Sequence, residues 1–330
     1  MNDKKFDINK AKNEYLDKLY SDRKTENTIK NYKVTYNQLV DLIAENMNEI
    51  EVTTLEFEKQ IKLFLKHLSD RYKSSSTIQA KRTHIKGLIC FCYKENLIDK
   101  DFSGNIESVK KEKGKEAAVL TPEEIDRINK LLIKDLEEAR EYDVFYKARN
   151  RFIVMLFLWT GARKSEVTRL RWKDIDMTSN KIIFRKSKGN KTRSMPLIQE
   201  LKLQIYEYKE ILEKLVSNGY DVSPGYYIFR SYHKKVVDGK EVHMTPRNVS
   251  DILDDIFKRA EVSEDITPHS IRHTFASYSI ENGVTIVALS KILGHGSVKI
   301  TLDTYAHIIN EKQMRNEMNK LNYNKSSYQG

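Results

Sequence analysis

Proline is missing from this 330-residue chain before Pro122, and the first 108 residues contain two glycines. Because these residues are the strongest interrupters of helices, their scarcity favours long helices in the N-terminal third. Cysteine is also scarce. Cys90 and Cys92 are two positions apart on an expected helix and point in different directions, and no second Cys/His cluster accompanies them to complete a metal site. We interpret them as reduced thiols of a cytoplasmic protein.

Long apolar runs are absent from the sequence. The longest, FIVMLFLW at residues 152–159, is far too short to span a bilayer. The N-terminal sequence MNDKKFDINK lacks the apolar core of a signal peptide. The sequence therefore predicts a cytoplasmic protein without a membrane partner.

Positive charge is abundant by contrast. The 58 lysines and arginines outnumber the 47 acidic residues, which gives a net charge of +11. Such a surface attracts polyanions, although a generally basic protein without an anionic partner is the alternative. The length favours two domains, and 39% hydrophobic residues are enough to build their cores.

The first 108 residues predict a helical domain. Apolar residues recurring every three or four positions and polar helix-start residues predict four helices, over 8–20, 26–46, 53–71 and 74–97. From Arg71 to Lys94 the chain carries basic residues and no acid. We interpret this run as a DNA-phosphate surface rather than a merely solvated helix face. Its candidate contacts are Lys73, Lys81, Arg82 and Lys86.

Residues 109–117 are charged and lack periodicity, which indicates a linker. Thr121, Pro122 and Glu124 then form a strong helix-start signal, so a second, mainly helical domain is expected to begin near residue 118. Within it, segments 181–186 and 192–197 predict a short β-hairpin, and 226–230 a further short strand.

Four stretches in the second domain carry residues suited to phosphodiester chemistry. They are TGARKSEVTRL (160–170), FRKSKGNKTRSMPL (184–197), TPHSIRHTFAS (267–277) and LGHGSVKITLDTYAH (293–307). Such chemistry needs a nucleophile, cations on the non-bridging oxygens and an acid for the leaving group. Arginine suits the oxygens because its planar fork donates two hydrogen bonds and stays charged. The candidates are Arg163, Lys188, His269, Arg272, His295 and Tyr305, with Glu166 as a supporting acid that orients Arg163 or a neighbouring basic group.

Each candidate has a simpler alternative. Arg163 and Glu166 could be solvated residues at a helix junction, and Lys188 one more basic residue on a hairpin. His295 could cap or pack a turn. His269 and His273 are four residues apart, which makes a metal site a further alternative. However, the glutamate that directly follows the first histidine in zinc proteases is missing here.

Together the four stretches resemble the tyrosine recombinase (phage integrase) family over 160–307. The resemblance assigns the catalytic arginines to Arg163 and Arg272, the hairpin lysine to Lys188, the histidines to His269 and His295, and the nucleophile to Tyr305. It departs from the family pattern at Ala162 and Gly296, where leucine and serine are frequent.

The resemblance implies a mainly α (α+β) fold. A four-helix core-binding (SAM-like) domain over 1–108 is followed by a catalytic domain over 118–307 with a small antiparallel sheet. Additional DNA contacts are expected at Lys191, Arg193 and Arg247. The short segment before the first helix favours a recombinase without an arm-binding domain. Residues 308–330 predict a tail helix that docks on its own domain or on a neighbouring protomer.

The family mechanism implies cleavage through a 3′-phosphotyrosine without ATP, metal or other cofactor. It also implies a tetramer on double-stranded DNA with inverted-repeat core sites, with an accessory directionality factor as a further partner. We expect integration or excision of a mobile element. Xer-type dimer resolution, type IB topoisomerase-like relaxation and non-catalytic DNA binding are the alternatives.

Overall fold

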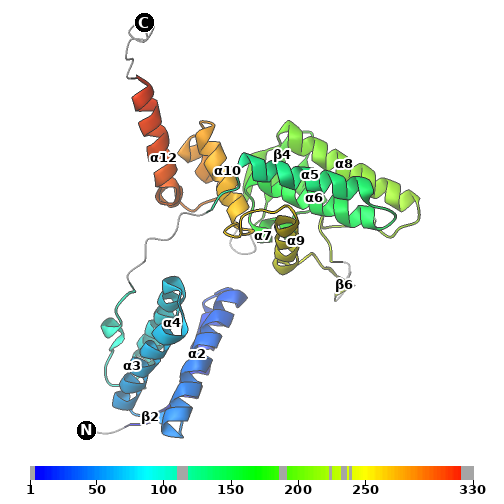
Figure 1. The fold of residues 1–330 in the computed structure, drawn as a ribbon. Coiled ribbons are helices and arrows are strands. Elements are labelled where there is room, and N and C mark those ends of the chain that lie inside the picture. Colours follow the sequence, from blue (N-terminus) through cyan, green and yellow to red (C-terminus); the bar gives the residue numbers. More distant parts are fainter. Residues whose placement is uncertain are drawn as a thin grey trace. The chain divides into compact units, whose positions relative to one another are not determined.

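The structure is a computed structural model that describes residues 4–109, 118–185, 192–222, 225–231, 236–237 and 240–320. The chain divides into two compact units, residues 1–115 and 116–330 (Figure 1). Both are mainly helical, and the small sheets are antiparallel, which confirms the expected fold class. Among the described residues, no helix is long and apolar enough to cross a membrane.

The first unit is a bundle of four helices. Its elements are β1 (Phe6–Asp7), α1 (Ile8–Ser21), α2 (Glu26–Met47), β2 (Glu51–Val52), α3 (Thr54–Arg71), α4 (Ser75–Lys94) and the short 3-10 turn η1 (Ser103–Asn105). The predicted helices are confirmed, and the fourth ends three residues earlier than expected. Their starts follow from side-chain caps: Thr25, Thr53 and Ser74 each accept a hydrogen bond from the first turn of the next helix.

Lys81 lies inside this bundle and not on its surface. The prediction that Lys81 contacts DNA is therefore corrected. Only 8% of the residue is exposed. Its Nζ donates to Gln38 Oε1 at 2.9 Å and lies 5.0 Å from the centre of the Tyr72 ring. The physical reason is helical spacing, because Lys81 comes three residues after buried Ile78 and four before buried Ile85.

The second unit is larger and contains three short β-ladders. Its helices are α5 (Pro122–Glu138), α6 (Asp143–Thr160), α7 (Lys164–Thr168), α8 (Gln199–Ser217), α9 (Pro246–Arg259), α10 (Ser270–Glu281), α11 (Ile286–Leu293) and α12 (Val298–Lys320), with a 3-10 turn η2 (Trp172–Asp174). Its strands are β3 (Ile175–Asp176), β4 (Lys181–Phe184), β5 (Arg193–Pro196), β6 (Val236–Val237) and β7 (Lys240–Glu241). The predicted capping box of Thr121 and Glu124, with Pro122 in the first turn, starts α5.

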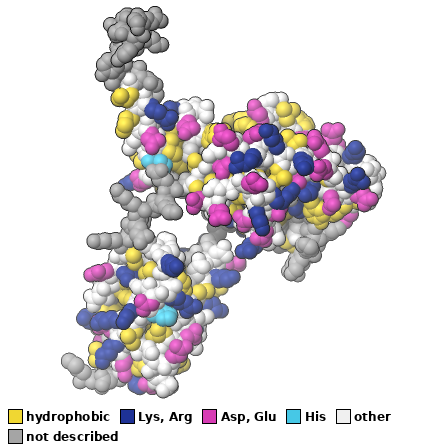
Figure 2. Space-filling view, viewed as in Figure 1, with side chains coloured by type: hydrophobic (Ala, Val, Ile, Leu, Met, Phe, Trp, Pro, Cys, Tyr) yellow, Lys and Arg dark blue, Asp and Glu magenta, His cyan; other side chains and the backbone are white. Residues whose placement is uncertain are grey.

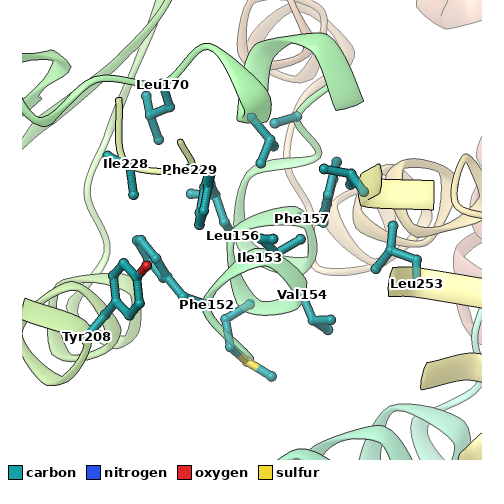
Figure 3. Packing of buried hydrophobic residues seen from close by; sticks show 14 of the residues in the cluster. Phe152, Ile153, Val154, Leu156, Phe157, Leu170, Tyr208, Ile228, Phe229 and Leu253 are labelled. Atoms are coloured by element: carbon teal, nitrogen blue, oxygen red, sulfur yellow. The ribbon is translucent and has the colours of Figure 1, made fainter. Parts of the chain in front are cut away.

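Helix α6 forms the centre of this unit and packs against α5, α8 and α10. Its apolar run is buried on nearly all sides, as Figure 3 shows for Phe152, Leu156 and Phe157 among their neighbours. Tyr208 of α8 and Phe229 pack on Phe152 with ring centres 5.0 and 5.6 Å away. This core fixes the C-terminal end of α6, from which the first candidate site residues follow.

The expected hairpin is present as β4 and β5, in the order β3-β4-β5 of a three-stranded antiparallel sheet. Residues 186–191, which include Lys188 and Lys191, lie outside the described residues. The strand expected over 226–230 is not a continuous strand. The segment makes single bridges at Tyr227 and Arg230 instead.

Helix α12 extends from the Tyr305 stretch into the expected tail helix. The backbone of Tyr305 leaves helical geometry (φ −116°, ψ 17°), so the residue lies at a break between two helical halves. Ile308 and Ile309, just after the break, pack on α10 and α11. Lys312 Nζ donates to the carbonyls of Ile280 and Glu281 at 2.6 and 3.0 Å. The beginning of the tail therefore docks on its own domain.

Candidate active site

Arg163 is presented by the turn between α6 and α7. Gly161 ends α6 in the left-handed conformation (φ +54°), and a Cβ there would lie 2.5 Å from Phe275. Arg163 then precedes the first turn of α7, and its backbone N–H donates to Glu166 Oε2 at 2.9 Å. Its side chain is 36% exposed, so the guanidinium faces solvent at one edge.

Glu166 holds two arginines together. Its Oε1 accepts from Arg163 Nη1 at 3.0 Å, and its Oε2 accepts from Arg193 Nη2 at 2.8 Å. Burial alone would raise the pKa of Glu166, but the hydrogen bond and charge of Arg193, together with Arg163, hold that pKa below its usual value. The carboxylate is therefore charged at neutral pH and orients Arg163.

Arg193 is buried, contrary to its expected role as a DNA contact. It lies 4.2 Å from the centre of the Phe184 ring and also donates to the carbonyl of Ile292. The cause is strand alternation, because Arg193 shares the inner face of β5 with buried Met195 two residues on. Arg193 is thus a structural link between the sheet and α11, and its charge is matched by Glu166.

Arg272 reaches the same place from α10. Its guanidinium donates to the backbone carbonyl of Gly161 and to that of Leu293 at 2.7 Å, and its Nη2 lies 3.1 Å from His295 Nε2. Burial, followed by the charges of Arg163 and Arg193, lowers the pKa of Arg272 to about 10. The group stays charged at neutral pH, and its buried charge favours an incoming anion.

The contact with Arg272 fixes the tautomer of His295. Because a guanidinium has only donors, the Nε2 of His295 must accept. Its Nδ1 then carries the hydrogen and donates to Thr301 Oγ1 at 2.7 Å. Thr301 is fully buried and orients the ring, a role that the sequence analysis missed. Its spacing to His295 carries no distinctive signal.

His269 lies at the N-terminus of α10 and is exposed to solvent. Burial, followed by the charges of Arg272, Lys164 and Arg163, lowers the pKa of His269. The ring is therefore neutral at neutral pH. It meets the His273 ring edge-on, with the ring centres 4.9 Å apart.

Tyr305 is 3% exposed and packs among apolar residues of α10 and α11. Its hydroxyl lies 3.2 Å from His273 Nδ1. Burial raises the pKa of the Tyr305 hydroxyl, and the charge of Arg272 partly opposes that rise. From the sequence alone, His273 suggests only an alternative metal site. Its spacing, directly after Arg272 and one turn from His269, is the signal that could have placed it beside the site.

The remaining predicted DNA contacts lie on two elements. Lys73 is exposed just before α4, and Lys86 is partly exposed on that helix. Arg82 Nη1 donates to the carbonyl of Glu107 at 2.8 Å. Arg247, in the first turn of α9, has an 86% exposed side chain and pairs with Asp251 at 2.8 Å. Figure 2 shows lysines and arginines interspersed with acidic residues on the visible face of each unit.

The site joins Arg163 and Arg193 through Glu166 and brings Arg272 to His295, with His269, His273 and Tyr305 alongside. Three guanidinium groups with one carboxylate leave the site positively charged. Such a site suits a phosphodiester, whose two non-bridging oxygens accept hydrogen bonds from arginine forks. The buried phenol is the one hydroxyl in this set that could serve as a nucleophile.

Comparison with known proteins decides the family. The sequence profile described as "Phage integrase family" matches residues 118–312, which include the arginines, the histidines, Glu166 and Tyr305 of the site. The chain belongs to the phage integrase family. It is therefore a DNA-binding tyrosine recombinase, an enzyme of site-specific DNA recombination that acts through a tyrosine nucleophile.

The curated relatives include Xer recombinases. Tyrosine recombinase XerC of Anoxybacillus flavithermus is 28% identical over 254 residues, covering 75% of this chain and 76% of the relative. XerC of Staphylococcus aureus is 25% identical over 309 residues, covering 92% and 94%. XerA of Pyrococcus furiosus is 32% identical over 182 residues, covering 55% and 54%.

Solved structures share the fold. A lambda integrase dimer bound to a COC′ core site is 18% identical, with a TM-score of 0.67 and coverage of 92% of this chain and 78% of that one. The Tn1549 transposon integrase in complex with transposon right end DNA is 18% identical, with a TM-score of 0.64 and coverage of 96% and 99%. XerH bound to its difH substrate is 21% identical, with a TM-score of 0.62 and coverage of 86% and 78%.

Proposed function

We propose that this recombinase cleaves DNA with Tyr305 and performs integration or excision of a mobile element. The observation that carries the proposal is the convergence of Arg163, Arg272 and His295 on the turn at Gly294. The carbonyl of Leu293 accepts from both arginines and that of Gly294 from Arg163, and Arg272 also contacts His295. Tyr305 packs on α10 and α11, which supply Arg272 and Leu293.

In the proposed reaction the scissile phosphate binds where the two arginine forks meet. Arg163 and Arg272 donate to its non-bridging oxygens, and His295 supports the same charge. The Tyr305 oxygen attacks phosphorus and forms a 3′-phosphotyrosine. Lys188 donates a proton to the departing 5′ oxygen, and His269 assists the proton transfers. The phosphotyrosine conserves the bond energy, so the return reaction needs no ATP.

Xer-type dimer resolution is the second candidate. The similarity to proteins named XerC and XerA favours it. The DNA next to the gene discriminates the two roles. Inverted repeats at the ends of a mobile element support integration or excision, whereas a single chromosomal site of paired repeats supports dimer resolution. An accessory directionality factor belongs to the first role.

The proposed assembly is a tetramer on two inverted-repeat sites. The end of α12 exposes Met314 and Met318, which are 66% and 61% accessible, although the helix begins by docking on its own domain. A cavity of about 370 Å³ on the catalytic unit has a mainly apolar lining that includes Met155, Trp159 and Phe275. The end of α12 from a second copy is the proposed occupant, because the chain's own two methionines remain exposed to solvent.

The deciding experiment uses a nicked suicide substrate built on the mapped inverted repeat. Tyr305→Phe keeps the ring and its packing and removes only the nucleophilic oxygen. We expect DNA binding near that of the parent protein and no covalent protein–DNA adduct on a denaturing gel. An adduct formed by Tyr305→Phe would assign the nucleophile to another residue.

A further inference from the structure

The hydroxyl of Tyr305 has a specific neighbour that the family assignment does not explain. His273 Nδ1 lies 3.2 Å from the hydroxyl oxygen, and the two ring centres are 5.7 Å apart. His273 follows Arg272 on α10, and its ring contacts that of His269. The contact is therefore part of the site and not an isolated surface pair.

A phenol becomes a good nucleophile only when its proton leaves as the oxygen attacks. Burial raises the pKa of the Tyr305 hydroxyl, so the proton is still present when DNA binds. Arginine side chains cannot accept it, because they have only donors. The Nε2 lone pair of His295 already accepts from Arg272. His269 contacts the ring of His273, and among the described residues His273 is the base that contacts the hydroxyl itself.

We propose that His273 is the proton acceptor for Tyr305 during strand cleavage. The inference rests on the proposed role of Tyr305. As the phenol oxygen bonds to phosphorus, its proton moves to Nδ1 of His273, which becomes an imidazolium. The bond from phosphorus to the 5′ oxygen breaks, and that oxygen takes its proton from the general acid. The hydrogen bond also directs the hydroxyl proton away from the phosphate and leaves a lone pair free to attack.

The surroundings of His273 keep its ring unprotonated before cleavage and favour return of the proton afterwards. Burial, followed by His269, Arg272 and His307, lowers the pKa of His273 to about 4, so the ring is neutral and able to accept at neutral pH. The imidazolium formed on cleavage is consequently more acidic than an ordinary imidazolium. In the rejoining step Tyr305 is the leaving group, and the same ring returns the proton to its oxygen. Proton acceptance and return by one group obey microscopic reversibility.

The test combines two changes in the full-length protein. His273→Leu removes the acceptor while keeping an apolar side chain, and a fluorinated tyrosine placed at position 305 supplies a more acidic hydroxyl. The rate of adduct formation is measured in single turnover on the suicide substrate. We expect His273→Leu to slow cleavage by roughly a hundredfold or more. The fluorinated tyrosine should restore much of that rate in His273→Leu and change the parent rate far less.

Three controls separate this role from a structural one. His307→Leu removes a neighbouring histidine from the same surroundings and should cleave like the parent. His273→Asn keeps a polar group near Nδ1 that cannot take up the proton, so it should stay slow. Equal DNA affinity and thermal stability of His273→Leu and the parent establish that the variant folds.

Two results would overturn the inference. One is cleavage by His273→Leu at the parent rate or faster. The other is slow cleavage that the acidic tyrosine does not rescue. A failure of the underlying function is distinguishable, because Tyr305→Phe would then still form an adduct.

Discussion

Glu166 and Arg193 form a buried ion pair in which Arg193 Nη2 lies 2.8 Å from Glu166 Oε2. Their side chains are 3% and 5% exposed, so each charge depends on the other for compensation. Because the second oxygen of Glu166 accepts from Arg163, this pair connects the sheet to an arginine that we propose binds the scissile phosphate. The stability of the domain and the geometry of its site are therefore coupled here.

Glu166→Gln should destabilise the catalytic unit by about 3–5 kcal/mol at neutral pH, because it leaves Arg193 buried without a counter-charge. The lowered pKa of Glu166 means that its contribution is complete above the usual carboxyl pKa. That contribution is lost as pH falls through the folded-state pKa, so the variant should lose less stability on acidification than the parent. Urea unfolding at neutral and acidic pH measures both effects.

The matched control is Asp126→Asn, which removes an exposed pair with Lys130. This variant should lower the free energy of unfolding by less than about 1 kcal/mol. Equal losses of stability in the two variants would show that the buried pair contributes no more to stability than the exposed pair.

Gly294→Ala should impair cleavage strongly, whereas Gly296→Ala should have little effect. Gly294 has φ +64°, and an added Cβ would lie 2.7 Å from Cδ of Arg193. Its carbonyl also faces Arg163. A Cβ at Gly296 meets no atom within 4 Å. Adduct formation and thermal unfolding of both variants check the prediction, and similar behaviour of the two alanines would contradict it.

The helix caps illustrate what could be predicted from the sequence. Capping residues act on their own first turn, so the starts of α4 and α5 at Ser74 and Thr121 were predictable from local sequence. The burial of Lys81 and Arg193 depends on which face of an element meets the core. Apolar neighbours at the right spacing carried that information, but the charge of each residue suggested a surface position. The proximity of His273 to Tyr305 required the tertiary packing of α10 against α12.

DNA affinity should fall when Lys73 and Lys86 are changed together to glutamate. Both are accessible at or near α4, and each lysine that neutralises a phosphate releases a counterion on binding. The slope of log affinity against log salt should become shallower by about one to two units. The charge-matched control changes Lys59 and Lys66, both exposed on α3, together to glutamate. Fluorescence anisotropy across a salt series gives the slopes, and an equal change in the control would assign the effect to net charge alone.

Truncation after Lys312 should leave half-site binding intact and reduce cooperative assembly and complete recombination. The cut keeps the contacts of Ile308, Ile309 and Lys312 with the domain and removes Met314 and Met318.

Trp159→Arg, in the proposed acceptor cavity, should produce the same defect. Leu55→Arg is the control, because Leu55 is exposed in the other unit. Band-shift assays on single and paired sites separate the two stages, and normal paired complexes from the truncated chain would exclude docking in trans.

The hydrogen bonds that hold the Arg272 guanidinium determine which substitutions around it the protein can tolerate. Two of its acceptors, at Gly161 and Leu293, are main-chain carbonyls, which every amino acid possesses. A substitution at Leu293 can change the side chain and still present the same oxygen, whereas Gly161 is restricted by its left-handed backbone. The geometry of the proposed active site thus depends largely on the path of the chain, while the side chain of Leu293 is restricted separately by its burial in the core.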